Sequence, residues 1–490
     1  MSFKENLSKS KEYGVIEFVN HPIVRVSGLP TVEVDEVVIF ENDDIGHVSA
    51  IRKNSVEIVS YSKVPPKYGT RVTKGGKLLG LTISDGLLGK VISPLGVPRF
   101  TYDSFKNEGE EKPIDIQPPV LMSRTRIKRQ FVTGIAVIDS VIPLGKGQRE
   151  LVVGDRKTGK TSTTLTLVKS QILEGSIVVY ALIAKDKSFT KKLKEYLESI
   201  NLMDSVVIVS TSPDDSPSLI DLTPYSAMTI AEYFRDNGRD VVILFDDLTT
   251  HAKYYREISL IAKKFPGRDS YPGDVFYKHA RLLERAGNFK NDKSKIKEAS
   301  ITAIALAETI NGLLSDYIVS NLISITDGHL HFDAAIFNKG RRPAIDLFLS
   351  VTRVGKQTQS QISRQLTREV MALMTKYESS SNFKHLGAEL TEEIKELLKK
   401  GDQVFAFFEQ SYQRALPLNM QLVFLGLIMS GAFMTSENLS EIREKKKNLY
   451  QSYKDEKVKL MIDNILEKSQ TYEAFMDSLD KYKTELMELC

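Results

Sequence analysis

Residues 154–161 place the strongest constraint on the fold of this protein. They read Gly-Asp-Arg-Lys-Thr-Gly-Lys-Thr, with an apolar run at 151–153 before them and a stretch of helical spacing at 162–173 after them. Gly154 and Gly159 let backbone N–H groups surround phosphate oxygens. Lys160 reaches the outer phosphates, and the Thr161 hydroxyl can bind Mg²⁺. The segment predicts a strand, a loop and a helix whose N-terminus binds nucleotide phosphates.

A second buried strand supplies an acid of the kind that such a site uses. Residues 241–245 are all apolar, and Asp246 and Asp247 follow them directly. An acid at the end of a buried strand can order the water shell of a bound metal. We predict that Asp246 holds Mg²⁺ through water and that Thr161 binds it directly. The alternative for these acids is a strand terminus or a helix cap.

The rest of the sequence divides into regions of different pattern. Short β-branched runs between turn residues at 13–80 predict a small β-barrel or sandwich, the alternative being an irregular β extension of the next domain. Nearly continuous apolar strands alternate with helical stretches at 81–357, which predicts a doubly wound α/β domain. Residues 358–490 show helical spacing and predict a helical domain, whose charge runs we interpret as solvated faces. Residues 1–12 are predicted to be a short tail.

Composition excludes several classes of protein. Lys and Arg number 67 and Asp and Glu 63, so the net charge of +4 gives no sign of a nucleic-acid-binding face. The single cysteine, Cys490, rules out an internal disulfide framework. No apolar run approaches the roughly 20 residues of a membrane span, and the N-terminus lacks a secretory h-region. We therefore expect a cytoplasmic protein that reaches a membrane only through partners.

Several further motifs identify a family. They lie at residues 143–151, 224–226, 232–238, 266–277, 281–285, 323–328, 340–345 and 350–355. With the phosphate loop, in which Lys157 replaces the family's glutamine, they resemble the alpha subunits of F-type ATP synthases in content and order. The resemblance implies a multidomain α/β fold with an N-terminal β-barrel, a RecA-like P-loop domain and a helical C-terminal domain.

The same resemblance implies a division of labour between two types of subunit. In the family, alpha-like and catalytic beta-like subunits alternate in a hexameric ring around a gamma-like shaft. Beta subunits orient the attacking water with a glutamate after the strand that follows the phosphate loop, where alpha subunits carry glutamine. Lys185 stands there in this sequence, and an ammonium cannot accept a proton. The resemblance therefore implies a subunit that binds nucleotide without hydrolysing it; Asp186, one residue further on, is the alternative acceptor.

Alpha subunits contribute to catalysis across the subunit interface. Arg353 matches the family's arginine finger, which stabilises charge on the transferring phosphoryl group in the neighbouring beta site. Ser324 matches a residue of the same interface. Without the resemblance, an arginine at a strand end would be interpreted as a surface ion pair.

The resemblance also implies a set of nucleotide contacts. The expected residues for ATP or ADP are Gly154, Asp155, Arg156, Lys157, Thr158, Gly159, Lys160, Thr161, Ser162, Arg342, Pro343 and Gln410. Arg342 and Pro343 match the base-side contact, and Gln410 matches a glutamine near the adenine. Residues 411–414 depart from the family's shorter loop.

The implied setting is a soluble head at the inner face of the cell membrane. The family's extra N-terminal helix, which docks the peripheral stalk, has no counterpart before residue 14. The absence of tryptophan and the richness in Lys, Asn, Ile and Ser are typical of an AT-rich genome such as a mollicute's. These features suggest a hydrolysis-driven motor, for example in gliding motility.

Two other functions remain as alternatives. A homohexameric RecA-like export ATPase or RNA translocase would need a catalytic glutamate in every subunit, and Lys185 argues against it. The intact Lys160 and Thr161 argue against a structural paralogue that binds no nucleotide.

Overall fold

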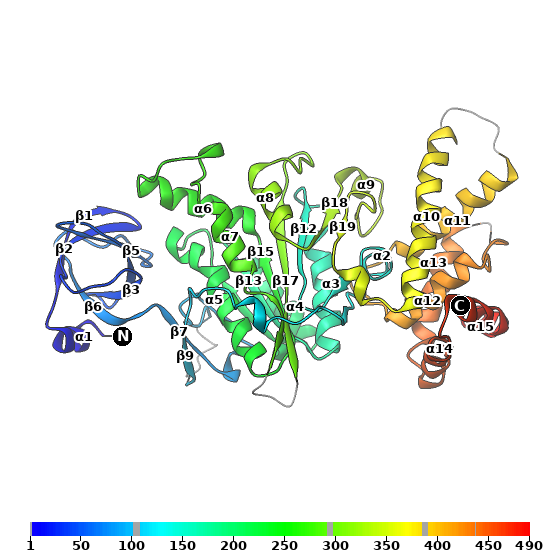
Figure 1. Cartoon of the computed structure of the whole chain (residues 1–490), viewed down its shortest axis with the longest axis horizontal. Coiled ribbons are helices and arrows are strands. Elements are labelled where there is room, and N and C mark those ends of the chain that lie inside the picture. The colour runs from blue at the N-terminus through cyan, green and yellow to red at the C-terminus, as the bar shows by residue number, and fades with distance from the viewer. Residues whose placement is uncertain (1, 101–107, 292–296, 385–390, 437) are drawn as a thin grey trace. The chain divides into compact units, whose positions relative to one another are not determined.

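A computed structural model describes residues 2–100, 108–291, 297–384, 391–436 and 438–490 of the protein (Figure 1). The polypeptide forms two compact units, each assembled from separate stretches of sequence. The first comprises residues 1–125, 175–309 and 313–326, and the second comprises residues 126–174, 310–312 and 327–490.

The first unit begins with a closed antiparallel barrel in the strand order β1-β2-β5-β4-β3-β6. The strands are β1 (Gly14–Asn20), β2 (Ile23–Gly28), β3 (Glu36–Phe40), β4 (Ile45–Ile51), β5 (Val56–Ser60) and β6 (Arg71–Leu78). Their inward side chains, among them Ile16, Val24, Phe40 and Ile58, are fully buried in one apolar cluster. The β-branched runs of the sequence therefore form the barrel that they predicted, because alternate residues fill its interior.

A short helix covers part of this barrel, in the segment that the sequence predicted to be a tail. Helix α1 (Phe3–Ser10) buries Phe3 against Val37 and Ile39, and Leu7 packs on the same cluster. Phe3 and Leu7 are four residues apart and so share one helix face. Two apolar residues in a polar segment give too weak a periodicity to predict a helix without the barrel surface beneath it.

The rest of the first unit is a parallel sheet with helices. The strand order is β17-β15-β13-β14-β8, and β16 pairs with β17 in antiparallel fashion. The strands are β8 (Val91–Ile92), β13 (Ile177–Leu182), β14 (Val206–Ser210), β15 (Val241–Asp246), β16 (Gly287–Lys290) and β17 (Glu298–Glu308), with a separate pair β7 (Gly80–Ile83) and β9 (Glu110–Pro113). The helices are α4 (Lys187–Ser199), α5 (Pro217–Asp236), α6 (Leu248–Ile261), α7 (Val275–Leu283) and α8 (Tyr317–Ile325). Every residue of β13, β14 and β15 is buried, as their continuous apolar sequences require.

The second unit contains a smaller group of strands and the C-terminal helices. Strand β12 (Arg149–Gly154) pairs in parallel with β18 (Gly328–Phe332), and β19 (Val351–Thr352) pairs with β18 in antiparallel fashion. Short strands β10 (Gln130–Phe131) and β11 (Leu144–Gly145) pair with each other, and helices α2 (Ala136–Val141), α3 (Lys160–Leu173) and α9 (Ala334–Asn338) complete this part.

The C-terminal helices pack around an aromatic core. They are α10 (Gln361–Lys384), α11 (Glu392–Phe408), α12 (Leu418–Met429), α13 (Leu439–Ser452), α14 (Glu456–Lys468), α15 (Tyr472–Lys481) and α16 (Lys483–Leu489). Phe424 of α12 stacks between Phe407 and Phe433, with ring centroids 5.1 and 5.2 Å apart. The predicted helical domain is confirmed. Within the described ranges, no helix combines the length and the apolar character that crossing a bilayer requires.

The barrel carries a titratable pair that makes its stability depend on pH. The Nδ1 atom of His47 on β4 lies 2.8 Å from the Tyr61 hydroxyl, and the two rings stack with their centroids 5.5 Å apart. Burial lowers the pKa of His47 from 6.5 to about 4. An unfolded histidine binds its proton at a higher pH than His47 does in the folded barrel, so stability falls as the pH drops from about 6.5 towards 4.

Replacing His47 with Phe should remove this acid sensitivity while keeping the ring stack. Between pH 7 and pH 5 we expect His47→Phe to lose about 2 kcal/mol less stability than the wild type. Melting temperatures at the two pH values measure the difference. Tyr61→Phe is the matched control, because it removes the same hydrogen bond but leaves His47 to titrate. Equal acid sensitivity in His47→Phe and in the wild type would contradict the prediction.

Candidate functional site

The phosphate loop has the predicted strand, loop and helix around it. Strand β12 ends at Gly154, and α3 begins at Lys160. A Cβ atom at Gly154 would lie 2.3 Å from the carbonyl oxygen of Phe332, so only glycine fits beside β18. Lys157 and Gly159 have φ angles of 63° and 95°, which turn the backbone sharply before the helix.

Lys160 is held across this loop by hydrogen bonds to the backbone. Its Nζ atom donates to the carbonyl oxygens of Gly154 and Asp155, both at 2.6 Å. The Thr158 hydroxyl also donates to the Asp155 carbonyl oxygen, at 2.8 Å. The N-cap of α3 is Gly159, which has no side chain that could cap the first turn, and the N-terminus of a helix favours an anion.

Three of the predicted loop contacts form an exposed rim around this helix end. Arg156, Lys157 and Ser162 lie toward solvent, whereas Thr158 and Lys160 are buried. Asp155 accepts a hydrogen bond from the Gly312 N–H at 2.8 Å through its Oδ1 atom, which ties the loop to residues 310–312 of the same unit. The loop thus combines a fixed backbone, a buried ammonium and an exposed basic edge, which suits a nucleotide polyphosphate.

In the first unit, the end of β15 holds an ion pair that the sequence did not predict. The Lys185 Nζ atom lies 2.7 Å from Asp246 Oδ1 and 3.8 Å from Asp247 Oδ2. Asp246 is 3% exposed. Burial acts to lower the pKa of Lys185, but Asp246 and Asp247 outweigh it and raise that pKa above its usual value. Lys185 is therefore a fixed positive charge at neutral pH.

The two acids at this strand end have different roles. Asp247 is the N-cap of α6, because its carboxylate accepts a hydrogen bond from the Thr250 N–H at 2.6 Å. The helix-cap interpretation is therefore correct for Asp247, while Asp246 pairs with Lys185. Asp186, the alternative acceptor, is an exposed residue at the start of α4.

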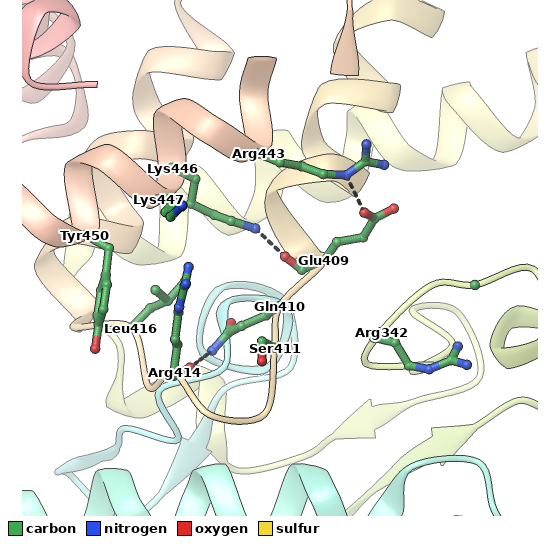
Figure 2. A pocket seen from close by; sticks show the side chains of 11 residues that line it. Arg342, Glu409, Gln410, Ser411, Arg414, Leu416, Arg443, Lys446, Lys447 and Tyr450 are labelled. Atoms are coloured by element: carbon green, nitrogen blue, oxygen red, sulfur yellow. Dashed lines mark hydrogen bonds and ion pairs between the residues drawn. The ribbon is translucent and has the colours of Figure 1, made fainter. Parts of the chain in front are cut away.

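Gln410 and Arg342 line a cavity of about 340 Å³ in the second unit (Figure 2). Both ends of the Gln410 amide are already bonded to the backbone. Its Nε2 atom donates to the carbonyl oxygens of Gly134 at 2.6 Å and Arg414 at 2.5 Å, and its Oε1 atom accepts from the Ala136 N–H at 3.1 Å. The Gln410 N–H donates to the Arg342 carbonyl oxygen at 2.7 Å. Gln410 thus joins three parts of this unit.

The same cavity is strongly basic because α13 contributes to it. Figure 2 shows Arg443 paired with Glu409, and Lys446 directed at the backbone beside Glu409. Lys446 also donates to the Phe407 carbonyl oxygen at 2.9 Å, and burial lowers its pKa to about 8. The interpretation of this charge run as a solvated face is wrong for Lys446, which is buried. Helical spacing alone does not show which lysine of a run faces the next helix.

The two residues predicted at the subunit interface lie toward solvent. Arg353 follows β19, and its N–H donates to the Asp327 carbonyl oxygen at 3.0 Å. The preceding apolar side chains, Phe348, Leu349 and Val351, are 40%, 49% and 37% exposed. Ser324 lies on α8, and its hydroxyl donates to the Ser320 carbonyl oxygen at 2.9 Å.

Comparison with known proteins identifies the family. The model of the ATP synthase alpha/beta family nucleotide-binding domain matches residues 134–352, and the model of the C-terminal domain of ATP synthase alpha and beta subunits matches residues 359–486. The protein belongs to the ATP synthase alpha/beta family. The expected resemblance and the expected order of barrel, nucleotide-binding domain and helical domain are therefore confirmed.

Relatives within this family match almost the whole sequence. The ATP synthase subunit alpha of Mycoplasmoides gallisepticum is 35% identical over 98% of this protein and 93% of its own length. That of Aquifex aeolicus is 33% identical over 98% and 95%, and ATP synthase subunit alpha 2 of Syntrophus aciditrophicus is 36% identical over 86% and 81%. The protein is thus similar to alpha subunits along its length.

We expect Gln410→Ala to act mainly on stability, because its amide bonds to the buried backbone of Gly134 and Ala136. Unpaired buried backbone groups should reduce the free energy of unfolding by about 2 kcal/mol, which melting temperature would detect. The exposed Gln413→Ala is the control and should change stability by less than about 0.5 kcal/mol. An unchanged melting temperature with weaker ATP binding would instead support the base-contact role.

Proposed function

We propose that this protein is the alpha-like, non-catalytic nucleotide-binding subunit of a rotary ATPase head. In this proposal it alternates with a catalytic beta-like subunit in a hexameric ring around a gamma-like shaft. The observation that carries the proposal is the ion pair of Lys185 with Asp246, in a protein whose phosphate loop is intact.

Nucleotide binding is supported by the geometry of the phosphate loop. The loop backbone, the Lys160 ammonium and the uncapped N-terminus of α3 together offer the donors and the positive charge that a polyphosphate needs. Arg342 adds a planar cation on the side where the family binds the base. Its guanidinium lies over the Phe337 ring, 3.3 Å from the centroid. We therefore propose ATP or ADP as the ligand.

The absence of turnover is supported by the chemistry of Lys185. A general base or a water-positioning residue must accept a hydrogen bond, and a charged ammonium only donates. The raised pKa of Lys185 keeps it charged at neutral pH. Asp186 is exposed at the start of the next helix, and its carboxylate forms no cap hydrogen bond that would fix its direction there. A homohexameric enzyme would need an acceptor at this position in every subunit, so the same observation argues against that alternative.

The role of Arg353 as an arginine finger is supported by its exposure and its surroundings. The loop that carries it is fixed at both sides: the Arg353 N–H bonds to Asp327, and a Cβ atom at Gly355 would lie 1.6 Å from the Pro143 carbonyl oxygen. Exposed apolar side chains precede it, as is usual where a partner covers the surface. A guanidinium on such a fixed loop can be placed accurately in a neighbour's site. Ser324 is proposed to belong to the same interface.

The setting of the head follows from the same proposal. We propose that ring partners connect the protein to the inner face of the cell membrane, so that this subunit works as a cytoplasmic, peripheral component. The tryptophan-free, lysine-rich composition supports a specialised hydrolysis-driven motor, gliding motility being one example.

Changing Arg353 to Ala in the reconstituted complex tests the finger. We expect ATP turnover per assembled complex to fall by about 10³-fold or more, because the guanidinium stabilises charge in the transition state. Arg353→Lys should restore little of it, since a point charge cannot replace the planar fork. Assembly and nucleotide binding should both remain.

The nearby exposed Lys356→Ala is the matched control and should leave turnover within about threefold of the wild type. Turnover is measured beside melting temperature and subunit content. If Arg353→Ala lowered assembly or melting temperature while the surviving complexes kept activity within about threefold, Arg353 would be an interface ion pair and not a finger.

A further inference from the structure

We propose that a basic pocket between the end of α11 and α13 binds a condensed phosphate, a diphosphate or triphosphate group, as a ligand separate from the one at the phosphate loop. The pocket is the part of the cavity of about 340 Å³ that Arg414, Lys446 and Lys447 line. Figure 2 shows the Arg342 guanidinium directed away from these side chains. Every lining residue belongs to the second unit. The proposal goes beyond the proposed function and does not depend on it.

The side chains of this pocket carry an excess of positive charge. Arg414, Arg443, Lys446 and Lys447 are basic, and Glu409 is the one acid among the described lining residues, which leaves a surplus of three positive charges. Arg443 pairs with Glu409 at 2.6 Å. A cavity of this volume is of the size that holds small molecules, and a surplus of like charge in it favours a compact polyanion.

Lys446 supplies charge to the pocket and fixes its walls. Its ammonium donates to the carbonyl oxygens of Ala406 at 3.2 Å and Phe407 at 2.9 Å, and also to that of Glu409. An ammonium has three protons, so all of them are used at the C-terminal end of α11, and this ties α11 to α13. Among the described residues no carboxylate forms an ion pair with Lys446, so its charge acts on the pocket.

The pKa of Lys446 reflects this crowding of positive charge. Burial lowers it from 10.5 to about 8, Glu409 acts to raise it, and Arg443 and Arg414 lower it further. A bound phosphate would oppose the repulsion from the two arginines, because a nearby negative charge stabilises an ammonium. Binding of an anion and retention of the Lys446 proton therefore favour each other.

Arg414 and Lys447 supply the hydrogen-bond donors that such an anion needs. Both are exposed, and within the described ranges neither side chain has a hydrogen-bond or ion-pair partner. Figure 2 shows the Arg414 guanidinium directed toward α13, the helix that carries Lys447. A guanidinium offers a planar fork that fits two phosphate oxygens, and an ammonium offers a compact charge. We therefore infer that these two side chains contact the phosphate directly.

The loop that carries Arg414 is held in place by its own backbone contacts. The Arg414 N–H donates to the Ser411 carbonyl oxygen at 3.1 Å, and the Arg414 carbonyl oxygen accepts from the Gln410 amide at 2.5 Å. The Thr166 hydroxyl of α3 donates to the Tyr412 carbonyl oxygen at 2.7 Å. A side chain presented from a fixed backbone loses less freedom when it binds a ligand. This is the segment that departs from the family's loop, so the resemblance did not imply this pocket.

Binding of pyrophosphate to the purified full-length Lys160→Ala protein, measured by isothermal titration calorimetry, tests the proposal. That variant weakens the phosphate loop, which would otherwise bind the same probe. We expect one pyrophosphate to bind with a Kd below about 1 mM. Adding Lys447→Gln should weaken binding at least about tenfold, because a charge-assisted hydrogen bond is lost. Lys457→Gln, an exposed lysine of α14 outside the pocket, is the matched control and should change the affinity less than about twofold.

ADP in place of pyrophosphate distinguishes two sources of the phosphate group. Tighter binding of ADP to the Lys160→Ala protein, still weakened by Lys447→Gln, would identify the diphosphate of a nucleotide. Equal or weaker binding of ADP would identify a free condensed phosphate. Both results retain a phosphate in the pocket, and they differ in the molecule that brings it.

A second measurement uses the wild-type protein. Pyrophosphate should protect Lys447, but not Lys457, from acetylation by acetic anhydride, followed by peptide mass spectrometry. Three results would each overturn the proposal: no pyrophosphate bound by folded Lys160→Ala protein, an affinity unchanged by Lys447→Gln, or acetylation of Lys447 unaffected by pyrophosphate. Failure of the proposed function looks different, because ATP would then not bind to the wild type or would bind equally well to Lys160→Ala.

Discussion

An ammonium, rather than a carboxylate or an amide, faces the acid at the end of β15. Lys185 and Asp246 are 2.7 Å apart, and the acid lies in a place that solvent barely reaches. The pair costs desolvation energy, and it persists because each partner would be far less stable there alone. The proposed absence of turnover rests on this pair, since a charged ammonium donates hydrogen bonds and cannot accept one.

In the proposed function, the phosphate loop and the Arg353 loop have two separate tasks. The first would retain a nucleotide through backbone N–H groups and Lys160, which requires no bond to be broken. The second presents a guanidinium on a fixed, exposed loop beside apolar side chains that a partner can cover. A subunit that binds one nucleotide and helps its neighbour to hydrolyse another would use both loops. Neither task depends on an acceptor at position 185.

Local features of the sequence predicted much of this structure. The phosphate loop is contiguous, so its glycines, its lysine and the flanking strand and helix could be identified without knowing the fold. The barrel and the buried strands were predictable because short β-branched runs and continuous apolar runs are typical of β-strands. Helix α1 was missed because its two apolar residues matter only when the barrel surface is present to receive them.

Contacts between distant residues were beyond the sequence. Gln410 matched a base contact by position, yet its amide is engaged with Gly134, Ala136 and Arg414. In the sequence, Lys446 is one lysine of a charged run. Only the fold shows that it donates hydrogen bonds to carbonyl oxygens at the end of α11. The pairing of Lys185 with Asp246 joins the ends of two strands that are neighbours only in the folded sheet. In each case the residue type was visible, but its partner was not.

The central claim, a subunit that binds nucleotide but does not hydrolyse it, is tested most directly by measuring both properties on one sample of the purified protein alone. Bound ATP is counted after gel filtration, and phosphate release is followed in the same preparation. The account predicts retained ATP with turnover far below about 1 s⁻¹, the lower end of ordinary enzyme rates. Turnover of about 1 s⁻¹ or more from the protein without any partner would contradict it.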